Sequence, residues 1–196
     1  MPAGLLQKPF FSSSYPDARN YGSVGAVMAH ELTHGFDNVG RRYDQNGRLH
    51  NWWAPTDVVA FKKRADCLKI YYSSFTVGGH NVDGDLTLAE NIADNGGIKI
   101  SYEAFLELEQ SKGRPATEAD KQLFFLSWGQ TWCSVSRDGA LCGHAIVFGV
   151  QVCLCLEGCR ARRVAGLWLV CWCWLAWQAV CVGFHACGSR LALTPP

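Results

Sequence analysis

Apolar residues recur along the first part of the chain with the period of an α-helix. Over Gly22–Phe36 they are three, four or five residues apart, and no proline interrupts them. A second apolar stripe covers Thr56–Phe75, with lysines and an aspartate on the opposite face. A third helical stretch begins at Thr87 and ends near Gln110. This spacing predicts three helices.

The segments around these helices carry loop signals. Leu5–Gly22 is rich in Pro, Ser, Asp and Asn and is expected to form an extended loop. Thr76–Asp85 contains several glycines and is expected to form a loop or a hairpin. Gly96 and Gly97 lie inside the third helix, where glycine is a poor helix former, and we expect a weak point there.

A fourth helix is predicted near the end of this region. Thr117 and Asp120 have the spacing of a capping pair, and the helix that they open is expected to continue to about Cys133. The first 138 residues are therefore expected to be mainly α-helical.

The composition changes abruptly after Asp138. The chain has 196 residues, and eight of its 10 cysteines and four of its 8 tryptophans follow that position. The charged residues beyond it are few: Glu157, Arg160, Arg162, Arg163 and Arg190. We therefore predict one partial domain at 1–138 and an unrelated tail rich in Cys and Trp at 139–196. The net charge of +1 gives no electrostatic reason to expect nucleic-acid binding.

The tail contains an apolar segment, Val164–Cys187, without Asp, Glu, Lys or Arg. It is long enough for a membrane helix, but its tryptophans crowd the middle rather than the ends. The composition favours a sequence that is not native coding, either disordered or a spurious apolar helix. A genuine membrane span and a disulfide or metal-binding module are the alternatives. The chain does not open with a secretory signal, and we find no targeting signal in it.

His30, Glu31 and His34 form an H-E-x-x-H string on the first predicted helix. One helical turn is about 3.6 residues, so the two histidines project from one face and can share a zinc ion. Glu31 lies beside them, where it can take a proton from an attacking water and pass it to a leaving amine. The alternative is a pair of surface histidines on an amphipathic helix.

Three acidic residues can complete this set. Glu90 is a candidate third zinc ligand, and Asp94 lies four residues later on the same helix face. Asp94 or Asp37 can accept the free N–H of a ligating histidine, which fixes the orientation of the ring. The alternative roles are a Thr87–Glu90 capping box and, for Asp37, an ordinary turn at the end of a helix.

Five stretches occur in the order found in one enzyme family: PAGLLQKPFF, NYGSVGAVMAHELTHGFDN, GRRYDQNGRLHNWW, LAENIADNGG and QLFFLSWGQTWC. Together they resemble the C-terminal catalytic part of the neprilysin and endothelin-converting-enzyme family of zinc endopeptidases. The resemblance covers about 2–133. It implies an incomplete set of the catalytic helices of a thermolysin-like (gluzincin) peptidase.

The resemblance assigns a role to each candidate. One zinc ion is bound by His30, His34 and Glu90. Catalysis involves Glu31 as general base and acid, together with Asp94, and the histidines are oriented by Asp37 and Asp94. Family members are plasma-membrane ectoenzymes or secreted forms that cleave short peptides. We therefore expect an oligopeptide substrate, and membrane association of the full-length form.

Parts of the family pattern are absent from this sequence. A D-x-H-S-P segment, whose histidine stabilises the oxyanion, and a following arginine are missing. By resemblance, Cys67 and Cys133 pair with cysteines outside the matched segment, so both are expected to be free unless tail cysteines substitute. We predict a truncated endopeptidase with impaired activity; the alternative is a catalytically incompetent fragment that binds zinc or associates with membranes.

Overall fold

The computed structural model describes residues 3–77 and 80–132, and this part of the chain is mainly helical, as predicted. Two-residue strands β1 (Thr76–Val77) and β2 (His80–Asn81) pair antiparallel, so of the two predicted alternatives, a loop or a hairpin, the segment forms the hairpin. The five α-helices are α1 (Asp17–Asn20), α2 (Ala26–Thr33), α3 (Pro55–Ser73), α4 (Leu88–Ser111) and α5 (Glu118–Thr131). Shorter turns are η1 (Ala3–Leu5), the π-helical η2 (Tyr21–Gly25), η3 (His34–Phe36) and η4 (Gly40–Arg42).

The first predicted helix is present but is built from three pieces. A π-helical turn, η2, leads into α2, and η3 continues it as a 3₁₀ turn. The preceding segment, Leu5–Gly22, was expected to be an extended loop. This prediction is wrong at Asp17–Asn20, which form the short helix α1. Ala18 on α1 is buried against Phe105 and Phe124, and this tertiary packing stabilises a helical turn that the local composition disfavours.

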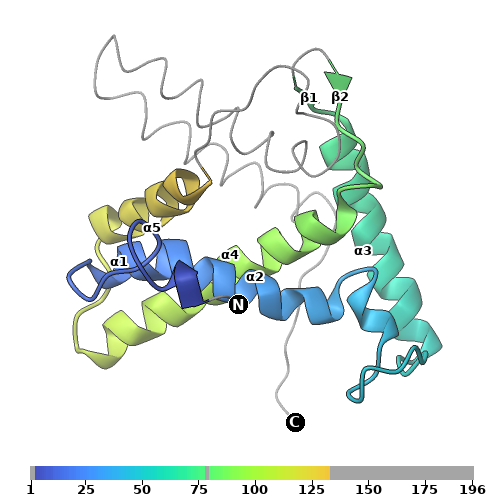
Figure 1. Ribbon diagram of the computed structural model, residues 1–196, viewed down its shortest axis with the longest axis horizontal. Helices are drawn as coiled ribbons and strands as arrows, with labels where there is room; N and C mark the ends of the chain where they lie inside the picture. Colours follow the sequence, from blue (N-terminus) through green and yellow to red (C-terminus); the bar gives the residue numbers. More distant parts are fainter. Residues whose placement is uncertain (1–2, 78–79, 133–196) are drawn as a thin grey trace.

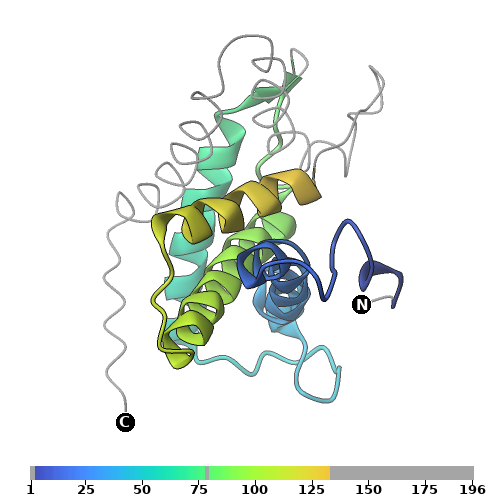
Figure 2. The same cartoon turned by 90° about the vertical axis from the view of Figure 1, so that its left-hand side faces the viewer.

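α2 and α4 form the most extensive contact between described elements. Figures 1 and 2 show the two helices side by side, with α5 over one end of the pair and α3 on another side. α4 runs unbroken through Gly96 and Gly97. A Cβ atom added at Gly97 would lie 2.8 Å from the carbonyl oxygen of Ala26 and 2.8 Å from the nitrogen of His30. The glycine therefore permits the close approach of the two backbones.

The described core consists of three small clusters. One joins α1, α4 and α5 through Ala18, Phe105 and Phe124. Another packs Trp128 of α5 on α2, and the third lies at the end of α3 around Tyr72. The predicted capping pair at the start of α5 is confirmed, because Thr117 and Asp120 exchange side-chain and backbone hydrogen bonds.

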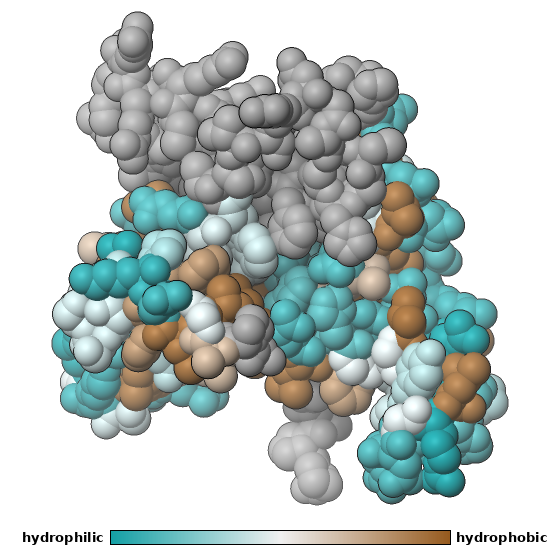
Figure 3. Space-filling view, in the orientation of Figure 1, coloured by the Kyte–Doolittle hydropathy of each residue, from teal (hydrophilic) through white to brown (hydrophobic). Residues whose placement is uncertain are grey.

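One face of α2 and η3 lacks a described covering element. Met28, Leu32 and Phe36 follow one another at four-residue spacing and are 54%, 64% and 51% exposed. The apolar spacing that predicted the helix therefore does not mark a single buried face. Figure 3 shows apolar side chains at several places on the surface that it presents.

The described residues contain no helix with both the length and the apolar character that a membrane crossing requires. The predicted tail at 139–196, with its apolar segment at 164–187, lies outside the described residues. So does Cys133, whereas Cys67 on α3 is disulfide-bonded rather than free.

Candidate metal centre

α2 and the turn that follows it present the two histidines of the H-E-x-x-H string to a common point. Nε2 of His30 and Nε2 of His34 are 3.0 Å apart, and the ring planes are nearly perpendicular, at 88°. Residues four apart on a helix lie on the same face, and this geometry follows directly from that spacing. His30 is only 5% exposed, so the alternative of two surface histidines is wrong for this residue.

The first turn of α4 brings Glu90 to the same point. Its Oε2 atom is 3.4 Å from Nε2 of His30 and 3.7 Å from Nε2 of His34. A tetrahedral zinc ion with bonds of about 2.0–2.1 Å separates its ligand atoms by roughly 3.4 Å. The three donor atoms therefore have the spacing of three corners of a zinc tetrahedron, and they form a metal-compatible cluster in the described chain.

A carboxylate holds the far side of each imidazole. Nδ1 of His30 is 2.8 Å from Oδ1 of Asp94, and Nδ1 of His34 is 2.7 Å from Oδ2 of Asp37. An ionised carboxylate only accepts, so each Nδ1 donates and each neutral ring directs an Nε2 lone pair to the centre. Two lone pairs and a carboxylate oxygen then face one another. Because such an arrangement is repulsive without a cation between its members, the residues present fit a metal ion.

Asp37 also has the turn role that was the alternative to ring orientation. Its Oδ1 atom accepts from the backbone N–H groups of Val39 and Gly40, at 2.6 and 2.7 Å, while Oδ2 holds His34. One buried carboxylate therefore fixes both the turn and the ring.

The capping-box alternative for Glu90 is wrong. The side chain of Thr87 makes no cap hydrogen bond to α4; its hydroxyl donates to the carbonyl of Asp83 at 2.9 Å. Glu90, whose side chain is 28% exposed, faces the two histidines instead.

The pKa values of His30 and Asp94, which form a buried pair, are both raised. Burial lowers the pKa of His30, but the hydrogen bond and charge of Asp94, with the charges of Glu90 and Glu31, outweigh burial and raise this pKa overall. Burial raises the pKa of Asp94, against the opposing effect of His30. Because the pKa of each group is raised, a proton is retained between Nδ1 of His30 and Oδ1 of Asp94.

Glu31 lies on α2 directly after His30, and its side chain is exposed to solvent. Its charge contributes to the raised pKa of His30, which places the carboxylate within electrostatic range of the centre. The site thus combines two imidazoles, a candidate third ligand and a solvent-accessible base.

Two residues pack against this site although the sequence analysis gave neither of them such a role. Gly97 touches the backbone of His30, and the ring of Trp132 lies 6.5 Å from the His30 ring, between centroids. The spacing of Trp128 and Trp132, one turn apart on the fourth predicted helix, was the available signal for an aromatic contact. Nothing in the sequence shows that they face α2.

A helix with H-E-x-x-H, crossed by a second helix that supplies a glutamate, defines a gluzincin-type metallopeptidase. The chain belongs to this class through one family: it is a member of peptidase family M13, whose family model matches residues 1–147. The match confirms the resemblance to the neprilysin and endothelin-converting-enzyme family, and it extends past Asp138.

Relatives and solved structures support this assignment. An endothelin-converting enzyme homolog of Locusta migratoria is 53% identical over 145 residues, which is 71% of this chain and 20% of the relative. Endothelin-converting enzyme 1 of Mus musculus is 47% identical over 139 residues, 68% of this chain and 18% of the relative. The zinc metalloprotease Zmp1 of Mycobacterium tuberculosis has a TM-score of 0.66 at 35% identity, over 77% of this chain and 24% of that structure. The chain thus spans about a fifth of the length of the curated relatives it matches.

Proposed function

We propose that this chain carries the zinc-binding part of an endopeptidase, with His30, His34 and Glu90 as the ligands of one zinc ion. The observation that supports this most directly is the convergence of two Nε2 atoms and one Oε2 atom within 3.0–3.7 Å of one another. Imidazole and carboxylate ligands suit zinc, and three protein ligands leave a position for substrate or water, which is typical of catalytic zinc sites.

The side chains around the centre have separable roles. When bound, zinc would supply a Lewis acid that polarises the scissile carbonyl and makes water more acidic. The Glu31 carboxylate takes a proton from the attacking water, whose oxygen forms a bond to the carbonyl carbon. Glu31 then delivers that proton to the amine nitrogen as the C–N bond breaks. Asp94 and Asp37 keep their histidines in the tautomer that leaves Nε2 free.

We further propose that the chain as printed has weak activity. Its sequence lacks the D-x-H-S-P segment and the arginine of the family pattern, and loss of one oxyanion donor costs about 100- to 1000-fold in rate. A catalytically incompetent zinc-binding fragment is the alternative that the same absence favours. From the family, short peptides are the expected substrates, and the cell surface or the extracellular space is the expected location of the full-length form.

Metal analysis of purified 1–196 tests the ligand set. We expect about one zinc ion per chain in the wild type, as in other sites with three protein ligands, and loss of most of it in His34→Ala. A wild-type chain that is folded by circular dichroism but binds no zinc would refute the ligand set.

Glu31→Gln tests the catalytic role separately. The substitution preserves size and removes the base, so zinc content should stay unchanged while slow cleavage of a fluorogenic peptide falls about 100-fold or more. Equal cleavage by mutant and wild type would remove Glu31 from the mechanism. Fast, chelator-sensitive cleavage by the wild type would overturn the proposal of weak activity.

A further inference from the structure

The two histidines of the centre are supported differently. His34 is held by Asp37, three residues away, and its side chain is 29% exposed. His30 is almost fully buried and depends on other helices: Asp94 of α4 holds Nδ1, and an aromatic ring at the end of α5 packs against the imidazole. This ring belongs to Trp132, with its plane tilted by 46° from that of His30.

Trp132 is placed by its neighbours on α5. It is the C-terminal cap residue of the helix, one turn after Trp128, and the two indoles meet edge to face with centroids 5.3 Å apart. Trp128 is buried on Ala26 and Val27, which lie one turn before His30 on α2. The two tryptophans therefore pack along one side of α2, Trp128 on Ala26 and Val27 and Trp132 on the imidazole of His30.

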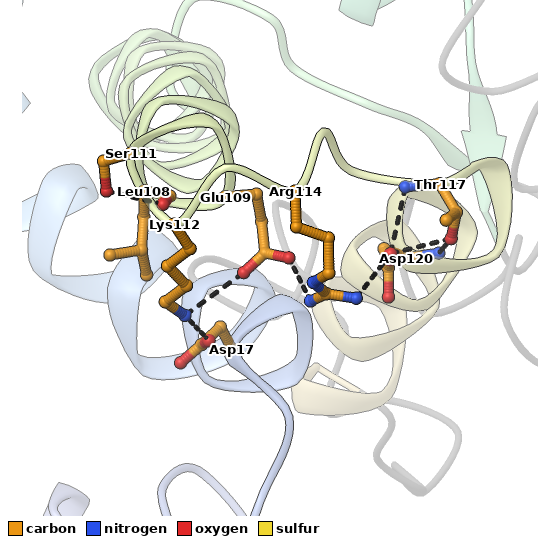
Figure 4. Close-up of polar contacts among 8 residues, drawn as sticks. All are labelled: Asp17, Leu108, Glu109, Ser111, Lys112, Arg114, Thr117 and Asp120. Atoms are coloured by element: carbon orange, nitrogen blue, oxygen red, sulfur yellow. Dashed lines mark hydrogen bonds and ion pairs between the residues drawn. The ribbon is translucent and has the colours of Figure 1, made fainter.

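The opposite end of α5 is fixed by an ion-pair network (Figure 4). Glu109, at the end of α4 and fully buried, pairs with both Lys112 and Arg114. Arg114 also reaches Asp120 at 3.7 Å, and Asp120 closes the capping box with Thr117. The start of α5 is thus tied to the end of α4, the helix that supplies Asp94.

The middle of α5 packs on α4 and on η2, the turn that leads into α2. Phe124 is fully buried and stacks on Phe105 of α4, with ring centroids 5.9 Å apart. A Cβ atom added at Gly22, just before α2, would lie 2.1 Å from the carbonyl oxygen of Phe124. With both its start and its middle fixed, α5 has little freedom to move Trp132 relative to His30.

We propose that Trp132 is a positioning residue for the metal-binding His30. The hydrogen bond from Nδ1 to Asp94 fixes one point of the imidazole but leaves the ring able to pivot about that point. Contact with the indole restricts the pivot and keeps the Nε2 lone pair directed at the centre. This inference rests on the metal site proposed above, and it assigns Trp132 a role in metal affinity that does not require contact with the ion.

Zinc binding by three variants of the 1–196 chain tests the proposal. Trp132→Ala should weaken zinc affinity about 10-fold or more, the range found when groups that orient a ligand are removed. Trp132→Phe keeps an aromatic ring and should restore most of the affinity. Trp52→Ala is the matched control, because Trp52 meets Trp53 edge to face and its indole N–H donates to the carbonyl of Tyr43. Its zinc affinity should equal that of the wild type.

Cobalt substitution supplies a readout independent of hydrolysis. Visible absorption of the Co²⁺-loaded Trp132→Ala chain should shift and broaden, because His30 then samples several orientations, whereas Trp132→Phe and Trp52→Ala should match the wild type. Equal zinc affinity and equal spectra in a folded Trp132→Ala chain would overturn the proposal. Absence of zinc from the wild type would instead refute the metal site itself, so the two failures are distinguishable.

Discussion

Each of the two carboxylates behind the histidines is buried, yet they differ in what else they do. Asp37, 3% exposed, divides its oxygens between a backbone turn and His34. Asp94, 2% exposed, faces His30 across a contact between helices. Loss of Asp37 would therefore disturb a local turn, whereas loss of Asp94 would act on the junction of α2 and α4.

Asp94→Asn should weaken zinc binding with little change in shape. The amide keeps the size of the side chain but removes the charge that stabilises the Nδ1 proton and strengthens the ligand. We expect zinc affinity at pH 8 to fall about 10- to 100-fold. Competition with a chromophoric chelator measures this, and unchanged affinity would show that Asp94 does not support the metal.

The same pair predicts a pH dependence. The raised pKa of His30 means that a proton competes with the metal for this ring at higher pH than it does at an ordinary histidine. Zinc affinity of the wild type should therefore decline as pH falls through that raised value. Asp94 raises this pKa, so in Asp94→Asn the decline should begin at lower pH. Dissociation constants measured from pH 8 to 5 would reveal the difference, and identical midpoints would contradict it.

At the scale of elements, the site depends on how closely α2 and α4 approach. The sequence identified the helices, the capping pair of α5 and the ligand spacing, because those follow from local pattern. It could not show why Gly96 and Gly97 occur together, because the reason lies in α2: a Cβ atom at Gly97 would meet the backbone of that helix, and one at Gly96 would meet the side chain of Thr33. Burial of Ala18 against Phe105 likewise depends on distant residues, and α1 was therefore missed.

Gly97→Ala should push α2 away from α4. The new methyl group would lie 2.8–2.9 Å from backbone atoms of Ala26 and His30, which cannot move as a side-chain end can. We expect about 1–3 kcal/mol of destabilisation, the usual cost of overpacking, together with weaker zinc binding. Gly35→Ala is the control: it adjoins His34, but an added Cβ there meets nothing within 4 Å. Equal melting temperatures and zinc affinities for the two variants would rule out this explanation.

The start of α5 has its own pH dependence. Hydrogen bonds from the hydroxyl and backbone N–H of Thr117 lower the pKa of Asp120. A carboxyl with a lowered folded-state pKa stabilises above its unfolded pKa, and this contribution is lost as pH falls through the folded value. Asp120→Asn should therefore reduce the melting temperature at pH 7, and the difference should shrink as pH falls through the lowered pKa of Asp120. A difference that persists in acid would point to packing instead.

At the scale of the whole molecule, the described core is divided among three small clusters, and several large apolar side chains are exposed. The proposed ligands lie on α2, η3 and α4, so a bound ion would link helices that belong to different core clusters. The sequence singled out the three candidate ligand residues but gave no sign of this division, because separate clusters arise from the arrangement of helices rather than from their periodicity.

Zinc should therefore stabilise the chain as a whole. At a free concentration 100 times its dissociation constant, a ligand that binds only the folded state adds about 2.7 kcal/mol. We expect a higher melting temperature with zinc, reversed by a chelator and absent in His34→Ala. An equal rise in the melting temperature of His34→Ala would mean that zinc stabilises the chain by binding at another site.

The four-residue spacing of His30 and His34 has a consequence for the order of assembly. Together with Asp37, these residues form half of the centre within little more than two helical turns. That half can capture a cation before α4 docks, whereas Glu90 and Asp94 must arrive across a long loop whose closure costs entropy. Zinc present from the start of refolding should then speed the joining of the two helices rather than only secure the finished structure. Stopped-flow refolding, with zinc added before or after dilution from denaturant, would measure this kinetic role.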